Sequence, residues 1–198
     1  MVASGATSAA RERILSHGLG IASQQGLNAL TMGTLARELD MPRSGLTIHF
    51  ANRESLQLGV LEQAIALFQR DVVNASVNAS PGDAHLKAMF GRWIAWSRAP
   101  MLKGGCPFVH ASRQSDDLAE PVRFRLKEVL DGWSDVLSAA IGEAKAASQF
   151  RSDLDIDQVV FELYGLYLSH HFFHWNMKDK AAEARTIKAF DRLLAASR

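Results

Sequence analysis

Hydrophobic residues recur every three or four positions along most of this chain. That period is typical of amphipathic α-helices, whereas strands alternate apolar and polar residues. In the first such segment, Ile14, Leu15, Leu19 and Ala22 share one helix face, and Gly26 marks its C-terminal end. Runs of β-branched residues and hairpin turns between alternating segments are almost absent. The pattern therefore predicts an all-α fold of about nine helices.

Capping residues and breaks divide this pattern into separate helices. Thr31 is a suitable N-cap for a short helix to Leu39, and a tight break at residues 40–42 follows. A second short helix is expected to reach about Phe50, with Asp40 as its cap because Pro42 replaces the usual polar residue. Further helices are expected at about 52–72, 83–99, from 107, from 121, at 155–177 and at 180–196.

The helix expected at 155–177 is apolar nearly all round between Val159 and Phe173. A helix of this kind needs cover on two sides. The rest of the subunit and a second subunit are candidates for these two covers.

Residues 31–50 have the layout of a helix-turn-helix. The small Ala36 suits a close helix crossing, and the expected core between the two helices is Leu35, Leu39, Leu46 and Phe50. The second helix carries polar residues that can face outward, and a helix fits the DNA major groove, which is about 12 Å wide. The alternative interpretation is an ordinary αα-corner in a helical bundle.

The segment 11–62 resembles the DNA-binding domain of the TetR family of bacterial transcriptional regulators. The matching elements are Ile14-Leu15, Gly26, Leu30-Thr31-Met32, Leu35-Ala36, Leu46, His49-Phe50 and Asn52-Arg53-Glu54-Ser55-Leu56. The resemblance implies a homodimer, with residues 1–55 binding pseudo-palindromic operator DNA and residues 56–198 binding a small-molecule effector. It also implies that the helices at 155–177 and 181–196 form the dimer interface.

The recognition helix departs from the family's pattern at several positions. Gly45 stands where the family often has threonine, Thr47 replaces a frequent tyrosine, and Ile48 replaces a polar residue. Ile48 is suited to a thymine methyl group, and Arg53 matches the family's usual phosphate-binding lysine. The expected DNA-binding residues are Thr31, Arg43, Ser44, Gly45, Thr47, Ile48, His49 and Arg53. The departures leave open a sensor on the same fold whose DNA binding is weak or lost.

Aromatic residues are concentrated beyond residue 89, where all four tryptophans and both tyrosines lie. Buried Trp and Tyr require partners for their polar tips, and pockets between helices are common ligand sites. The expected effector-binding residues are Phe90, Trp93, Trp96, Cys106, Phe108, Trp133, Tyr164, Tyr167 and His171. The alternative for the aromatic residues is that they form ordinary hydrophobic core. The alternatives for Cys106 are a redox sensor and a small buried apolar residue.

Composition narrows the class of protein further. The net charge is +1, from 22 Lys and Arg against 21 Asp and Glu, so bulk positive charge does not hold nucleic acid here. A single cysteine excludes an intrachain disulfide and a Cys-rich zinc site. His170 and His174 are one helical turn apart but lack a third ligand nearby, so neither a metal nor a cofactor is expected.

The sequence also bears on location and on catalysis. No signal peptide is expected at the N-terminus, and Asp157 and Glu162 interrupt the most apolar stretch, residues 156–175. We therefore expect a cytoplasmic protein without a membrane partner. No glycine-rich phosphate loop, paired-carboxylate motif or nucleophile signature is present, which argues against an enzyme.

Overall fold

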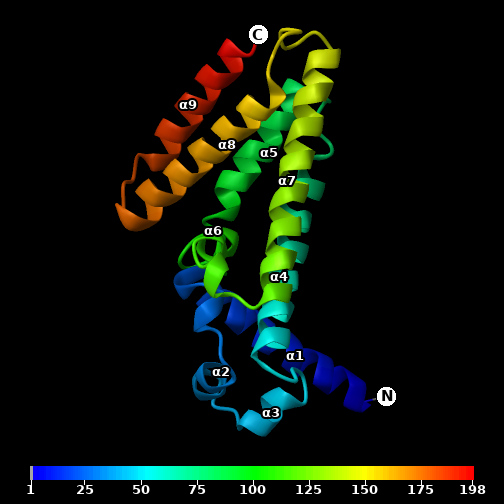
Figure 1. Cartoon of the computed structure of the whole chain (residues 1–198), viewed down its shortest axis with the longest axis vertical. Coiled ribbons are helices and arrows are strands. Elements are labelled where there is room, and N and C mark those ends of the chain that lie inside the picture. The colour runs from blue at the N-terminus through cyan, green and yellow to red at the C-terminus, as the bar shows by residue number, and fades with distance from the viewer. Residues whose placement is uncertain (1) are drawn as a thin grey trace. The chain divides into compact units, whose positions relative to one another are not determined.

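The computed structural model describes residues 2–198, with side chains from Ser8 onward (Figure 1). Within that range the regular structure is entirely helical, which confirms the all-α prediction. The nine α-helices of this range are α1 (Val2–Gln25), α2 (Met32–Glu38), α3 (Arg43–Thr47), α4 (Arg53–Phe68), α5 (Asp83–Trp96), α6 (Pro107–Ser112), α7 (Glu120–Ala146), α8 (Ile156–His171) and α9 (Ala182–Ala196). In the same range no helix is long and apolar enough to cross a bilayer.

Side-chain caps begin three of the helices at the expected positions. The Thr31 hydroxyl accepts the backbone N–H of Thr34 at 3.0 Å, at the start of α2. The Asn52 side chain accepts the N–H of Ser55 at 2.8 Å, next to the start of α4. Asp155 caps α8 in the same way. Each cap satisfies an N–H group that has no partner within its helix.

Two details of the expected helices are wrong. Asp40 does not cap α3, because it adopts a left-handed φ of 50° in the turn and Pro42 occupies the cap position without a side-chain bond. The helices expected at 52–72 and 155–177 both change to π-helical geometry before their ends, in Gln69–Asn74 and Phe172–Asn176. Such wide turns depend on tertiary packing, and the apolar spacing does not distinguish them from α-helix.

The chain forms two compact units. The first comprises Met1–Leu67 and Ala99–Glu128, and the second comprises Phe68–Arg98 and Val129–Arg198. The chain therefore passes between the units three times, in α4, near residue 98 and in α7. The functional boundary at residue 55 stays a prediction.

In the first unit, the C-terminal end of α1 packs against the segment that contains α6. The Gly104 N–H donates to Ser23 Oγ at 3.2 Å, and the Gln114 amide donates to the Gln25 carbonyl at 3.1 Å. Gly26 ends α1 with a φ of 84°, a conformation that favours glycine. These bonds hold the end of α1 immediately before the helix-turn-helix.

In the second unit, α8 and α9 form an antiparallel pair beside α5 (Figure 1). Arg98 binds Glu183 through two hydrogen bonds of 2.7 and 2.8 Å. The Trp175 indole N–H donates to the Ser97 carbonyl at 3.0 Å. The end of α5 is thereby tied to both sides of the turn between α8 and α9.

His170 lies in this tied region and is only 1% exposed. Its ring stacks on His174, with centroids 5.5 Å apart. Burial, together with the neighbouring His174 and Arg98, lowers the pKa of His170 to about 4, against smaller opposing effects of Glu183 and the Ala182 backbone. His170 is therefore neutral in the folded protein at neutral pH.

We expect the folded protein to lose stability as the pH falls from about 6.5 toward 4. In this window the unfolded chain protonates His170 while the folded chain does not, and the cost is about 2 kcal/mol at pH 5. The pKa of His174 is also lowered, so its effect has the same sign. Urea unfolding at pH 7.5 and pH 5 measures the loss, and His170→Phe should remove most of it. A variant with the same pH profile as the wild type would contradict this assignment.

Candidate DNA-binding and effector sites

The helix-turn-helix has a compact apolar centre. Leu35, Leu46 and Phe50 are buried between the helices, and the buried Ala36 permits their close approach. The N–H of Met41 donates to the Ala36 carbonyl at 2.9 Å and closes the turn. Leu39, which the sequence placed in this core, is only half-buried at the edge of the motif.

The outer face of α3 presents most of the residues expected to contact DNA. Arg43, Ser44, Thr47 and Ile48 are exposed, whereas Gly45 and His49 are half-buried. The Thr47 hydroxyl donates to the Ser44 carbonyl at 3.0 Å, which commits its proton to the helix. The structure thus brings these residues to one short helix.

Arg43 folds back over the first turn of α2. Its Nη2 atom lies 2.8 Å from the position that a Cβ on Gly33 would occupy. Thr31 is next to this contact and is half-buried, with its hydroxyl used in the cap of α2. Gly33 therefore makes room for the arginine, a relation that the sequence pattern does not reveal.

Arg53 and Gln57 hold the loop before α2 from the first turns of α4. Arg53 donates from Nε to the Leu30 carbonyl at 3.2 Å and from Nη2 to the Asn28 carbonyl at 2.7 Å. Gln57, only 2% exposed, donates to the Leu27 carbonyl at 2.7 Å. We call these two residues the α4 clamp. The sequence did not identify Gln57 as a residue of the site. The one signal for it in the sequence is that a polar residue stands next to the apolar face of α4.

Replacing Gln57 with leucine should destabilise the protein by about 1 kcal/mol. The change removes the buried hydrogen bond to the Leu27 carbonyl, which keeps the Leu30 N–H at 3.1 Å as its other donor. Chemical denaturation followed by circular dichroism measures the loss. Gln63→Leu, a half-buried glutamine farther along α4, is the matched control. Equal stability of the two variants would contradict a structural role for the clamp.

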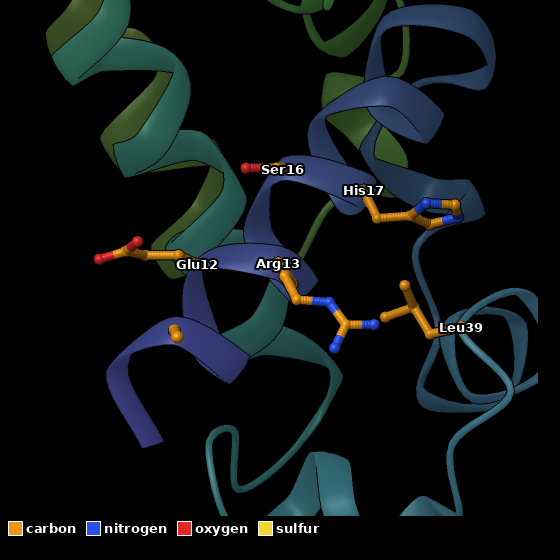
Figure 2. Close-up of a pocket in the computed structure, with 6 residues that line it drawn as sticks. Glu12, Arg13, Ser16, His17 and Leu39 are labelled. Atoms are coloured by element: carbon orange, nitrogen blue, oxygen red, sulfur yellow. The ribbon is translucent and has the colours of Figure 1, made fainter. Parts of the chain in front are cut away.

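A shallow hollow of about 650 Å³ lies beside the motif, against α1 (Figure 2). Arg13 and His17 project from α1 toward Leu39, whereas Glu12 and Ser16 point to other sides of the helix. His17 Nε2 is 2.7 Å from Glu38 Oε2, so this contact pins the end of α2 to α1. Both side chains are partly exposed, and such a contact contributes at most about 1 kcal/mol.

The second unit contains a cluster of aromatic rings from α5, α7 and α8. Trp93 stacks on Tyr167 with centroids 4.0 Å apart and meets Trp133 edge-on at 5.2 Å. Tyr164 packs edge-on against Trp93 at 5.1 Å. Phe90 and Trp96 belong to the same connected set of rings. Six residues expected at an effector site thus belong to one connected set of rings, which Trp96 joins through Phe68. We call these seven residues the ring cluster.

Phe68 and Phe190 also contact these rings, and the sequence did not predict either of them at the site. Phe68 packs edge-on against Trp133 at 5.0 Å and against Trp96 at 5.6 Å. Phe190 stacks on Phe90 at 4.2 Å. Both sit in ordinary apolar stripes of their helices, so spacing alone gave them no distinguishing signal.

The polar atoms of the ring cluster differ in how they are satisfied. Tyr164 Oη donates to the Leu130 carbonyl at 3.1 Å, and the Ser134 hydroxyl donates to the same carbonyl at 3.1 Å. The Trp133 side chain is only 6% exposed, and its Nε1 has no hydrogen-bond partner. A buried donor without an acceptor is costly, so this indole is a natural anchor for an acceptor brought by a ligand.

The other expected effector residues are distributed between the two units. His171 is buried on α8, one turn beyond Tyr167. Cys106 and Phe108 are buried at the start of α6, in the first unit. Among the described residues, no group of three or more His, Cys, Asp or Glu side chains is arranged to hold a metal ion.

Comparisons with known proteins agree with this architecture. Residues 82–190 match the model of the tetracyclin repressor-like C-terminal domain. No curated protein matches the chain by sequence. Because the matched family model covers more than half of the chain, the chain belongs to the tetracycline repressor-like (TetR) family of transcriptional regulators. This membership confirms the class predicted from the sequence, a ligand-responsive DNA-binding regulator rather than an enzyme.

Solved structures share the fold at low sequence identity. A TetR regulator from Chloroflexus aurantiacus J-10-FL has a TM-score of 0.83 at 17% identity, over 96% of this chain and 94% of its own. A transcriptional regulator from Saccharomonospora viridis, in complex with choline, has a TM-score of 0.73 at 20% identity, over 93% and 95%. AibR, in complex with isovaleryl coenzyme A and operator DNA, has a TM-score of 0.68 at 17% identity, over 83% and 85%.

Proposed function

We propose that this regulator is a homodimeric repressor that binds a pseudo-palindromic operator and releases it when a small-molecule effector binds the second unit. The observation that carries the DNA-binding part is the outer face of α3, which presents Arg43, Ser44, Thr47 and Ile48 to solvent. Thr31, Gly45 and His49 border this face. A short exposed helix after a tight turn is the part of such a motif that enters the major groove.

Phosphate contacts come from the arginines on this surface. Arg43 lies at the start of α3, and Arg53 lies at the start of α4. Arg53 already uses Nε and Nη2 in the α4 clamp, so its Nη1 is the group offered to a phosphate oxygen. A dimer doubles these charges, which suits a moderate affinity that falls as salt rises.

The dimer is proposed on the outward face of α8 and α9. Large apolar side chains are exposed there, namely Phe161, Leu168, Phe172, Phe173, Met177 and Ile187. Several large exposed apolar side chains on one pair of helices are typical of an interface. A second copy related by two-fold symmetry covers it with the same surface, which closes the assembly at two subunits. We call this surface the α8–α9 face.

The effector site is proposed within the ring cluster, with Trp133 Nε1 donating to the effector. The aromatic lining favours an apolar or aromatic molecule that carries a hydrogen-bond acceptor. His171, one turn beyond Tyr167 on α8, borders the site. Cys106 and Phe108 lie in the first unit, and their expected part in effector binding stays a prediction. The related structures with isovaleryl coenzyme A and with choline support the view that this fold accepts diverse small ligands.

The link between the two sites is proposed to run along α4. This helix begins at the α4 clamp and its last residue, Phe68, belongs to the ring cluster. An effector that displaces Phe68 shifts the populations of two α4 positions, and it does so only as far as it prefers one of them. The operator affinity of the dimer changes with the position of α4.

The alternative function is a small-molecule sensor with little DNA binding, motivated by the altered residues of α3. DNase I footprinting on the DNA upstream of the protein's own coding region separates the two functions. The proposed function predicts two protected half-sites about 34–36 Å apart, centre to centre. Arg43→Ala should abolish protection, whereas Arg92→Ala, an exposed arginine on α5, should preserve it. A retained ligand response without any specific DNA binding would favour the sensor.

A further inference from the structure

Ile48 is a large apolar side chain that the described chain leaves almost entirely in solvent. It is 76% exposed at the C-terminal end of α3, although Leu46 and Phe50 on either side of it are buried. Burial of an isoleucine contributes about 1.5–3 kcal/mol relative to its exposure, so a partner that covers Ile48 gains this contribution. The exposed position is therefore available to an apolar group outside the chain.

The chemistry of the major groove limits what that group is. Base edges there present hydrogen-bond donors and acceptors, and their one apolar substituent is the 5-methyl group of thymine. An aliphatic side chain makes no hydrogen bond, and it desolvates a donor or acceptor that it covers without compensation. On a groove-facing helix, Ile48 is therefore complementary to thymine and unfavourable against the polar edges.

Two polar neighbours of Ile48 have their donor groups placed elsewhere. Thr47 donates its hydroxyl proton to the Ser44 carbonyl, so that proton is not available to a base. The Arg43 guanidinium lies over Gly33 at the other end of the helix. Ser44 is the exposed polar residue one turn before Ile48, and Ile48 is the large apolar side chain exposed on this segment.

We infer that Ile48 is a specificity-determining residue that selects thymine at one position of each operator half-site through its 5-methyl group. This inference rests on the proposed function and adds to it the chemical identity of a base. It makes the operator preference depend on a hydrophobic contact rather than on a hydrogen bond.

The test is a thymine-to-uracil scan of the operator found by footprinting. Deoxyuridine lacks only the 5-methyl group, and it keeps the base pair and every hydrogen-bonding atom. At one symmetric pair of positions, each replacement should weaken binding about fourfold, which is the effect of burying one methyl group. Replacing both members of the pair should weaken it about fifteenfold, because the two sites are independent.

Two variants identify Ile48 as the residue that senses the methyl group. Ile48→Ala should bind thymine and uracil operators with nearly equal affinity, whereas Ile48→Val should keep most of the discrimination. Met101→Ala, a change at an exposed apolar residue in the loop before α6, should leave discrimination unchanged. A cytosine at the selected position should be rejected less strongly when it carries a 5-methyl group.

These experiments distinguish a failure of the role inferred for Ile48 from a failure of the proposed function. Specific operator binding that tolerates uracil at every position overturns the role of Ile48 and leaves the proposed function intact. Discrimination that persists unchanged in Ile48→Ala also overturns it. The absence of any specific DNA binding by the wild-type protein overturns the proposed function, and this inference with it.

Discussion

Phe161→Glu should convert the protein from a dimer to a monomer and abolish operator binding. Phe161 is 73% exposed on the α8–α9 face, so the isolated subunit tolerates a polar side chain there. In a two-fold interface each substitution counts twice, because the same residue contributes from both subunits. At about 2 kcal/mol for each copy, dimerisation weakens about a thousandfold.

Sedimentation velocity and size-exclusion chromatography with light scattering measure the change in mass. Phe124→Glu provides the matched control, since Phe124 is 64% exposed on α7, outside the α8–α9 face. The control should stay dimeric and keep its affinity for the operator. Monomeric Phe161→Glu should still give the circular dichroism spectrum of the wild type. A dimeric Phe161→Glu, or dissociation of both variants alike, would contradict the proposed interface.

Gly104→Ala should destabilise the protein by about 3 kcal/mol. A Cβ at position 104 would overlap the Ser23 carbonyl oxygen and the Cα of Gln24, which are backbone atoms of α1. Backbone cannot move aside as the end of a flexible side chain does, so either α1 or the loop before α6 must shift. The shift also breaks the bond between the Gly104 N–H and the Ser23 hydroxyl.

Chemical denaturation measures this loss, with Gly20→Ala as the control on the same helix. A Cβ at position 20 meets nothing within 4 Å. Alanine in a helix is more stable than glycine by about 0.5–1 kcal/mol, so the control should gain stability. Because α1 immediately precedes the helix-turn-helix, operator affinity of Gly104→Ala should fall as well. Wild-type stability of Gly104→Ala would show that the contact between α1 and the loop is not maintained in solution.

Local signals in the sequence were sufficient for most of the helices. Thr31, Asn52 and Asp155 are side chains that hydrogen-bond the first N–H groups of a helix, and all three do so. Such caps depend on residues only three positions apart. Aspartate is also a common cap residue, so the sequence predicted a cap at Asp40. In the tight turn, however, its backbone adopts a left-handed conformation, and its side chain does not cap α3.

Contacts between distant residues were not predictable in the same way. Gln57 and Leu27 are thirty positions apart, and Phe90 and Phe190 are a hundred apart. Nothing in local spacing distinguishes a buried glutamine that bonds a loop carbonyl from one on a solvated surface. The sequence did indicate that aromatic residues gather beyond residue 89, and six of the expected residues do belong to one set of rings in the second unit.

The direction of Arg43 illustrates the same limit on a smaller scale. The helix-turn-helix pattern predicted the position of Arg43 on α3. The path of its side chain over α2 depends on Gly33, because any larger residue there would occupy the same space.

The most direct test of operator recognition through α3 is fluorescence anisotropy with a labelled fragment of the DNA upstream of the protein's own coding region. The titration is run at two salt concentrations and in an excess of unrelated duplex. Recognition through α3 predicts saturable binding that survives the competitor, weakens as salt rises and disappears in Arg43→Ala. Binding that the unrelated duplex removes completely, or that Arg43→Ala retains in full, would contradict sequence-specific recognition through α3.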